Sequence, residues 1–338
     1  MRNFEHLQAT SIAGAVAALT RFGGKARLNA GGTDLFGLLK DQYLPGFPDS
    51  IINIKGIQGL DAIGEERGTV TVGALAKLSE LSRSHLLAER FPALVQAAGA
   101  VASPQIRNVA TVGGNLCQDV RCAYYRYPSH VGGAIGCARK GNGPCLAVRG
   151  DNRYHAVLGG RKCYAVCPSD TAVALAALDA SLVVAGPEGE RRIGVAEFYT
   201  PLGNRLERGE MVVRIEIPTS SLPHQRFAKF ALRRPIDFAI VSVAVAASVT
   251  DGVCTEARIA LGAVAPGPVR AGEAESFLRG KRLTPEHATR AAELALSGAK
   301  PLSRNGYKVA IAKTLVKRAL LGEAAGGAGE YADVGLDR

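Results

Sequence analysis

Six of the seven cysteines in this chain lie in one segment, residues 117–167, and only Cys254 stands apart. The segment is rich in Gly, Arg, Tyr and Cys, and its apolar residues follow neither the helical period nor the strand period. An irregular segment of this length within a compact chain is usually functional or disordered. Cysteines gathered in this way favour metal binding or redox chemistry over disulfide bonds.

The bulk composition is that of an ordinary globular protein. The 338 residues are 47% hydrophobic and 21% charged, which is enough apolar material for two or three compact units. No apolar run reaches the roughly 18–20 residues of a membrane span, and the first six residues lack the apolar stretch of a secretory signal. We therefore expect a cytoplasmic chain with no membrane span.

Periodicity and capping residues predict alternating helices and strands. Ser11 is expected to cap a helix that ends before Gly23, and Thr284-Pro285-Glu286 is a strong helix start. Asp251-Gly252 predicts a turn. Further helices are expected at 75–101, 171–178 and 307–321, and strands at 51–54, 69–72, 181–184, 211–217, 238–249 and 257–261.

Two loops carry adjacent glycines next to a hydroxyl residue, at 29–34 (NAGGTD) and 110–115 (ATVGGN). Such loops let the backbone turn tightly, and their free N–H groups can hold phosphate oxygens. Neither loop is the dinucleotide fingerprint G-x-G-x-x-G, so a Rossmann domain does not follow. Taken singly, each is more often a plain tight turn, whereas the two together could hold opposite sides of one diphosphate.

Several separated motifs extend this pattern along the chain. They are residues 30–35 (AGGTDL), 73–75 (GAL), 107–116 (RNVATVGGNL), 168–170 (PSD), 198–200 (FYT), 210–213 (EMVV) and 229–233 (KFALR). In this order they resemble the flavin subunits of the xanthine oxidase and carbon monoxide dehydrogenase family, the molybdenum hydroxylases. The resemblance covers residues 1 to about 321.

The resemblance implies an α+β fold with two α/β subdomains around FAD and a C-terminal α/β domain. The expected boundaries are 1–60 for the first FAD-binding subdomain, 61–220 for the second with an insertion at about 117–167, 221–321 for the C-terminal domain, and 322–338 for a loose tail. No residue of this chain is expected to perform substrate chemistry.

The resemblance also implies which residues contact FAD. The two glycine loops should hold the diphosphate and ribityl chain, Val101 and Val212 should supply apolar contact, Asp170 should hydrogen-bond to the ribityl or adenosine side, and Lys229 should lie near the ring or its phosphates. The full expected set is Asn29, Ala30, Gly31, Gly32, Thr33, Asp34, Leu35, Phe36, Val101, Ala110, Thr111, Gly113, Gly114, Asn115, Asp170, Val212 and Lys229.

The insertion is long for this family, because 54 residues separate Asn115 from Asp170. It resembles the insertion of 4-hydroxybenzoyl-CoA reductase-type flavin subunits, which implies a [4Fe–4S] cluster held by Cys122, Cys137, Cys145 and Cys163. Cys167 remains an alternative to Cys163 as the fourth ligand. A zinc site and a reduced loop without metal are the other interpretations, although zinc sites favour compact paired ligands.

Basic residues concentrate in the same segment. Between Arg121 and Cys163 there are eight Lys or Arg residues and one acid, Asp151. They could offset the negative charge of a thiolate-bound cluster, attract an acidic carrier such as ferredoxin, or form a merely solvated surface. The formal net charge of +11 alone would also fit a nucleic-acid-binding protein, but the basic residues form no single amphipathic stripe, so we expect no nucleic-acid partner.

The resemblance implies a role in electron transfer. The partners would be a molybdopterin-binding large subunit and a small subunit with two [2Fe–2S] clusters. The 4-hydroxybenzoyl-CoA reductase resemblance favours electron flow from a low-potential donor toward molybdenum, for reductive removal of an aromatic hydroxyl from an acyl-CoA. The alternative is an oxidative hydroxylase or dehydrogenase of aldehydes, purines or N-heterocycles, in which electrons flow outward.

Overall fold

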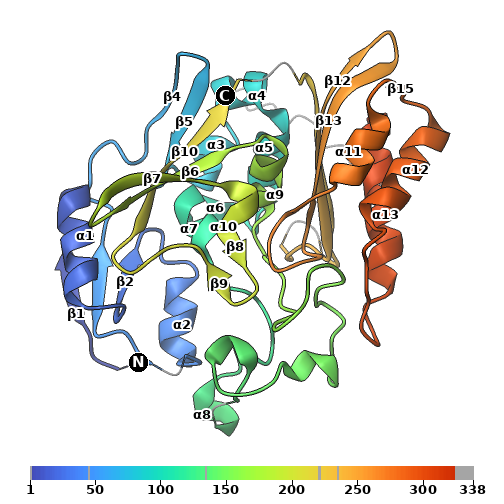
Figure 1. Cartoon of the computed structure of the whole chain (residues 1–338). Coiled ribbons are helices and arrows are strands. Elements are labelled where there is room, and N and C mark those ends of the chain that lie inside the picture. Colours follow the sequence, from blue (N-terminus) through green and yellow to red (C-terminus); the bar gives the residue numbers. More distant parts are fainter. Residues whose placement is uncertain (1, 45, 134, 220–221, 234–235, 324–338) are drawn as a thin grey trace.

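The computed structural model describes residues 2–44, 46–133, 135–219, 222–233 and 236–323, which form three main sheets with helices between and outside them (Figure 1). The first sheet is parallel, in the order β1 (Glu5–Gln8), β3 (Ser50–Asn53), β2 (Ala26–Asn29). Helix α1 (Ile12–Arg21) follows β1, and the Ser11 side chain caps it by accepting from Gly14 N at 3.1 Å. Helix α2 (Leu35–Asp41) starts directly after the first glycine loop.

The second sheet is antiparallel and occupies the middle of the molecule. Its order is β4 (Ile63–Glu66), β5 (Thr69–Gly73), β10 (Met211–Pro218), β6 (Ser181–Gly186), β7 (Gly189–Gly194), so β10 joins two segments that are far apart in sequence. The short elements α10 (Val195–Phe198), β8 (Tyr199–Thr200) and β9 (Gly203–Asn204) follow β7.

The helical pattern of residues 75–101 is broken into three pieces rather than forming one helix. These are α3 (Leu78–Leu81), α4 (His85–Arg90) and α5 (Pro92–Gly99). The cause is local, because Ser84 caps a new helix by accepting from Leu87 N, and Pro92 has no N–H to continue α4. Helices α6 (Pro104–Arg107) and α7 (Val112–Cys117) follow and lead to the insertion.

The C-terminal sheet is a separate antiparallel layer. Its order is β11 (His224–Phe230), β12 (Val241–Thr250), β13 (Val253–Gly262), β14 (Val269–Arg270), with β15 (Lys281–Arg282) paired to β13. Asp251 and Gly252 form the predicted two-residue turn between β12 and β13, with φ values of 51° and 78° that suit the twist of a hairpin.

Helices cover both faces of that sheet. Helices α11 (Gly272–Leu278), α12 (Pro285–Ala295) and α13 (Tyr307–Leu321) pack on its outer side (Figure 1). Thr284 caps α12 as the sequence predicts, accepting from His287 N at 3.3 Å. Helix α9 (Asp170–Ala177) contacts β12 and β13 and is buried at every position. The C-terminal half is thus joined to the rest of the molecule through α9.

In the described residues of the insertion between α7 and α9, the only regular elements are α8 (Ser129–Gly132) and two 3-10 turns, Ala138–Lys140 and Leu146–Val148, as its aperiodic sequence indicates. At one side its Val120, Tyr125 and Ala165 pack on α2. At the other side, the amides of Val157 and Leu158 both donate to the Val264 carbonyl, at 2.8 and 2.9 Å. The insertion therefore lies between the first subdomain and the C-terminal layer (Figure 1).

No helix that the structure describes combines the length and the apolar character needed to cross a bilayer. The expected domain boundary at 60 falls between β3 and β4, and the one at 220 lies outside the described residues; both stay predictions. Of the expected loose tail, residues 324–338 lie outside the described part of the chain.

Candidate functional site

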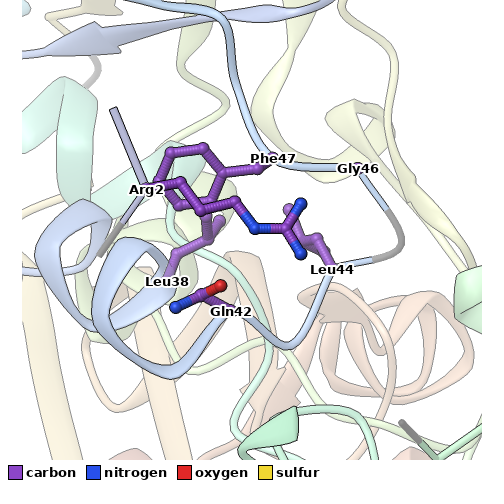
Figure 2. Close-up of a pocket in the computed structure, with 6 residues that line it drawn as sticks. All are labelled: Arg2, Leu38, Gln42, Leu44, Gly46 and Phe47. Atoms are coloured by element: carbon purple, nitrogen blue, oxygen red, sulfur yellow. The ribbon is translucent and has the colours of Figure 1, made fainter. Parts of the chain in front are cut away.

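A cleft of about 840 Å³ lies between the two glycine loops, β10 and the base of the insertion. This volume is within the range of roughly 300–1,000 Å³ that small-molecule and cofactor sites occupy. A second cavity, of only about 30 Å³, lies beside α2 where Arg2 crosses Phe47 and Leu38 (Figure 2). It has room for about one water molecule. The large cleft is therefore the candidate site.

The first glycine loop is pressed against the second. A Cβ at Gly31 would collide with the carbonyl of Val109 and the Cα of Ala110, so only glycine permits this approach. Gly32 has a φ of 72°, and a side chain there would strike the ring of Phe36. Within the described part of the chain, the amides of Gly31, Gly32 and Thr33 donate to no other protein group. Free N–H groups at the cleft wall are what a diphosphate requires.

The second glycine loop is held by its neighbours. Thr111 caps α7 by accepting from Gly114 N at 3.2 Å, and Gly113 N donates to Ala74 O at 2.9 Å. A Cβ at Gly113 would lie 2.8 Å from Ala74 atoms, so this glycine is required for packing on the end of β5. The loop is consequently rigid where it faces the cleft.

Asn115 ties this loop to the start of α9. Its Oδ1 accepts hydrogen bonds from Ser169 Oγ and Thr171 Oγ1, both at 2.6 Å, and all three side chains are buried. The insertion therefore leaves and re-enters the fold at one fixed point. This explains how so many added residues leave the glycine loop intact.

The structure brings most of the expected FAD contacts to the cleft surface. Those that line it are Ala30, Gly31, Gly32, Thr33, Asp34, Leu35, Val101, Ala110, Thr111, Gly113, Gly114, Asn115 and Val212. Four expected residues do not line it: Asn29, Phe36, Asp170 and Lys229. Asn29 lies beneath Gly32, and its buried Oδ1 has no hydrogen-bond partner among the described residues.

Asp170 and Lys229 pair with each other behind the cleft. Lys229 Nζ lies 2.7 Å from Asp170 Oδ2 and also donates to Ala100 O at 2.9 Å. Burial raises the pKa of Asp170, against the opposing effect of Lys229. The pair joins β11, α9 and the end of α5, so its position is that of an internal brace.

Several cleft residues were not singled out from the sequence as contacts. Tyr199, Leu202 and Phe238 line the cleft from segments C-terminal to the insertion. Tyr199 is fixed there because its hydroxyl donates to Leu116 O at 2.9 Å. The motif at 198–200 was visible as part of the family pattern, but nothing in the sequence alone predicts that this ring faces the cleft.

The six cysteines of the segment separate into two groups. Cys117 and Cys167 line the cleft; Cys117 is exposed there, whereas Cys167 is buried, and burial raises the pKa of the Cys167 thiol to about 11. The other four lie together deeper in the insertion. The Cys122 thiol interacts electrostatically with Cys137 and Cys145, and Cys145 with Cys163. A hydrogen bond between the last two lowers the pKa of Cys145 and raises that of Cys163.

A polar network forms the wall between the cleft and the four-cysteine group, defined as Cys122, Cys137, Cys145 and Cys163. Asp119 accepts from Tyr125 Oη at 2.6 Å and pairs with Arg139 at 2.8 Å. Arg139 lines the cleft and interacts electrostatically with Cys163. Asp34 of the first glycine loop pairs with Arg121 and Arg126, both at 2.7 Å. Arg139 thus connects the cleft with the four-cysteine group.

The basic residues of the insertion serve two different roles. Arg121, Arg126 and Arg139 are turned inward and paired with Asp34 or Asp119. By contrast Arg149, Arg161 and Lys162 are exposed. The structure therefore divides the positive charge between a buried network and an outer surface.

Two family models match this chain. Residues 2–220 match the FAD binding domain in molybdopterin dehydrogenase, and residues 226–322 match the CO dehydrogenase flavoprotein C-terminal domain. The FAD assignment agrees with the free amides and the volume of the cleft.

Individual relatives resemble the chain over nearly its whole length. The FAD-binding subunit of aldehyde oxidoreductase, PaoB, from Escherichia coli is 33% identical over 93% of this chain and 96% of its own. The medium chain of carbon monoxide dehydrogenase from Hydrogenophaga pseudoflava is 29% identical, covering 94% and 96%. A solved structure of that organism's carbon monoxide dehydrogenase superposes with a TM-score of 0.75 at 29% identity, over 96% of this chain and 97% of that one.

The fold expected from the sequence is thereby confirmed, whereas these comparisons do not single out the 4-hydroxybenzoyl-CoA reductase type. With the two matched domains together spanning almost every described residue, this chain belongs to the FAD-binding subunits of the molybdenum hydroxylase and carbon monoxide dehydrogenase family.

Proposed function

We propose that this chain is the electron-transfer subunit of a cytoplasmic, multi-subunit molybdenum enzyme, in which FAD in the cleft exchanges electrons with an iron–sulfur cluster in the insertion. The observation that carries the proposal is the position of Arg139, which lines the cleft and also interacts with Cys163. Arg139 would therefore border both the flavin and the cluster. FAD would supply the conversion between two-electron and one-electron steps.

The direction that we propose is outward, from an oxidised substrate to an external acceptor. The relatives named above are an aldehyde oxidoreductase and a carbon monoxide dehydrogenase, which supports the oxidative alternative of the sequence analysis over reductive dehydroxylation of an aromatic acyl-CoA. The aldehyde class is favoured because that relative has the higher identity of the two.

In the cleft, the free amides of Gly31, Gly32 and Thr33 would bind the diphosphate, and Val101 and Val212 would pack on apolar parts of FAD. Asn29 and Phe36 support the first glycine loop from behind, since both contact the position of a Gly32 side chain. Asp170 and Lys229 would act indirectly, by bracing α9 and β11 behind the cleft. The chain's own role is thus to bind and orient the flavin.

We propose that the four-cysteine group holds a [4Fe–4S] cluster. Cys117 and Cys167 are separated from this group because they line the cleft, which favours Cys163 over Cys167 as the fourth ligand. Among the described residues, no three His, Cys, Asp or Glu side chains converge as ligands of one metal ion. A cubane does not require such convergence, because each thiolate binds a different iron, whereas tetrahedral zinc requires four ligands about one point.

The proposed partners are a molybdopterin-binding large subunit, a small subunit with two [2Fe–2S] clusters and an acidic redox carrier such as ferredoxin. The name of the carbon monoxide dehydrogenase relative, medium chain, supports an assembly with larger and smaller chains. The exposed Arg149, Arg161 and Lys162 support a carrier of negative charge, because their positive charges face solvent on the insertion.

A cysteine series tests the cluster and its ligands. In the intact complex, Ser replacements of Cys122, Cys137, Cys145 and Cys163 should each lose about four irons from this chain while FAD is retained. Cys254→Ser is the matched control, because Cys254 is buried in the C-terminal layer, and its iron content should equal that of the unmodified complex. Full iron retention in all four variants would reject the cluster.

The electron direction needs its own experiment. The native complex, purified with its co-purifying subunits, should reduce an artificial acceptor when supplied with an aldehyde. Flavin bleaching by the aldehyde under anaerobic conditions would give the same information without turnover. Failure to reduce the flavin with any aldehyde, purine or N-heterocycle, together with oxidation of reduced flavin by an aromatic acyl-CoA, would restore the reductive interpretation.

A further inference from the structure

The insertion contains one buried histidine beside the four-cysteine group. His155 is only 6% exposed, and its Nε2 lies 3.3 Å from Cys122 Sγ. On the other side of the ring, Nδ1 is buried and has no hydrogen-bond partner among the described residues. A neutral imidazole carries one N–H. A buried N–H without an acceptor costs more free energy than a buried nitrogen lone pair without a donor. The proton therefore belongs on Nε2, pointing at the sulfur.

The histidine is held in place by the C-terminal layer rather than by the insertion alone. The carbonyl of His155 accepts from Lys308 Nζ at 3.0 Å and from Asn305 Nδ2 at 3.1 Å, and both donors are fully buried. The His155 amide donates to Asn152 O at 3.0 Å. The ring packs on Tyr124, with 6.1 Å between the centroids. A side chain fixed in this way keeps its donor aimed at one atom.

We propose that His155 donates a hydrogen bond from Nε2 to the Cys122 thiolate and so raises the reduction potential of the cluster that this thiolate helps to hold; the inference rests on the cluster proposed above. The physical reason is that a reduced cluster carries one more negative charge, which a donor at a ligand sulfur stabilises more than it stabilises the oxidised form. His155 is thus a positioning residue that acts through Cys122.

The test compares His155→Leu, which removes the donor but keeps an apolar side chain, with His155→Gln, which keeps an N–H donor. His130→Leu is the matched control, because His130 is an exposed histidine of the same insertion. Iron and FAD are quantified in each intact complex, and the midpoint potential of the cluster is measured by a redox titration followed by EPR.

With His155→Leu, iron and FAD should be retained. The one-electron equilibrium constant for cluster reduction should fall about tenfold, which makes the midpoint potential more negative by about 59 mV. His155→Gln should recover much of the difference, and His130→Leu should show none. An unchanged midpoint in His155→Leu would overturn the inference. So would loss of iron from both His155 variants, since the residue would then hold the cluster together rather than set its potential.

The two proposals fail in different ways. If the unmodified complex holds no cluster that depends on the four cysteines, the proposed function fails and the inference with it. If that cluster is present and the His155→Leu midpoint is unaltered, only the role of His155 is rejected.

Discussion

Lys229 Nζ lies 2.7 Å from Asp170 Oδ2, and the two side chains are 11% and 5% exposed. The pair connects the first residue of α9 with β11, and the two residues are 59 positions apart in sequence. Because both charges are removed from water, loss of either partner would leave an uncompensated charge in the interior.

Removing one member of this pair is expected to be strongly destabilising. Lys229→Met should lower the free energy of unfolding by about 3–5 kcal/mol, because it leaves a buried carboxylate unpaired. The double variant Asp170→Leu/Lys229→Met should recover most of the loss. Urea unfolding measures both. Retention of FAD by the double variant is expected, since neither residue lines the cleft; a stable double variant that lost FAD would show that the pair contacts the cofactor directly.

The contact between the glycine loops gives a second prediction. Gly31→Ala should lose most of the bound FAD, because its Cβ would meet the Val109 carbonyl and force the loops apart. Gly37→Ala is the control, since a Cβ at this helical position meets nothing within 4 Å. It should keep all FAD and gain roughly 0.5–1 kcal/mol of stability. FAD released per chain is the measurement, and equal content in the two variants would contradict the prediction.

Lys308 gives a prediction about pH. It is completely buried, and burial lowers its pKa from 10.5 to about 7. Between these values the unfolded chain binds one more proton than the folded chain, so stability should rise with pH, by up to about 1.4 kcal/mol per pH unit from this group. This pH-dependent contribution of Lys308 to the free energy of unfolding is lost as the pH falls through about 7. In Lys308→Met this contribution should vanish, whereas Lys300→Met, at an exposed position, should keep it.

The measurement is urea unfolding at several pH values between 7 and 10, with the slope compared among the three proteins. A slope that is the same in Lys308→Met and the unmodified chain would mean that Lys308 stays charged in the fold. The three carbonyls that it contacts, of Tyr154, His155 and Ala263, would then be compensating for its burial.

The exposed basic residues predict a salt-dependent reaction with an acidic carrier. Arg161→Glu/Lys162→Glu should reduce the rate of electron transfer to ferredoxin several-fold at low ionic strength, because like charges replace complementary ones. The difference should shrink above about 0.5 M salt, where screening acts within a few ångströms. Arg21→Glu, on α1, is the control. Equal rates for the double variant and the control would exclude this surface as the docking site.

Local signals in the sequence were sufficient for much of the secondary structure. Ser11 and Thr284 cap the helices that they predict, and Asp251-Gly252 forms the expected turn. Each of these depends on neighbours within four residues. The prediction of one helix at 75–101 was wrong. The apolar pattern there is continuous, but Pro92 ends one helix and begins another within it.

Long-range packing was harder to predict. Strand β11 was missed because its sequence, HQRFAKF, mixes charged and apolar residues, and its environment is set by contacts with β12, α5 and α13, which lie elsewhere in the sequence. The glycine loops were predicted as a cradle, but the free amides of Gly31 and Gly32 become evident only when the loops meet. The pairing of Lys229 with Asp170 depends on α9 lying under the C-terminal sheet, which no local pattern indicates.

The insertion packs on α2 at one side and hydrogen-bonds to Val264 at the other. A backbone cut within it, for example after the exposed Arg149, would therefore leave two fragments that remain associated under native conditions and separate only in denaturant. An irregular segment of this kind would withstand trypsin better than its composition indicates. Its durability would come from neighbours far away in the chain rather than from any helix or strand of its own.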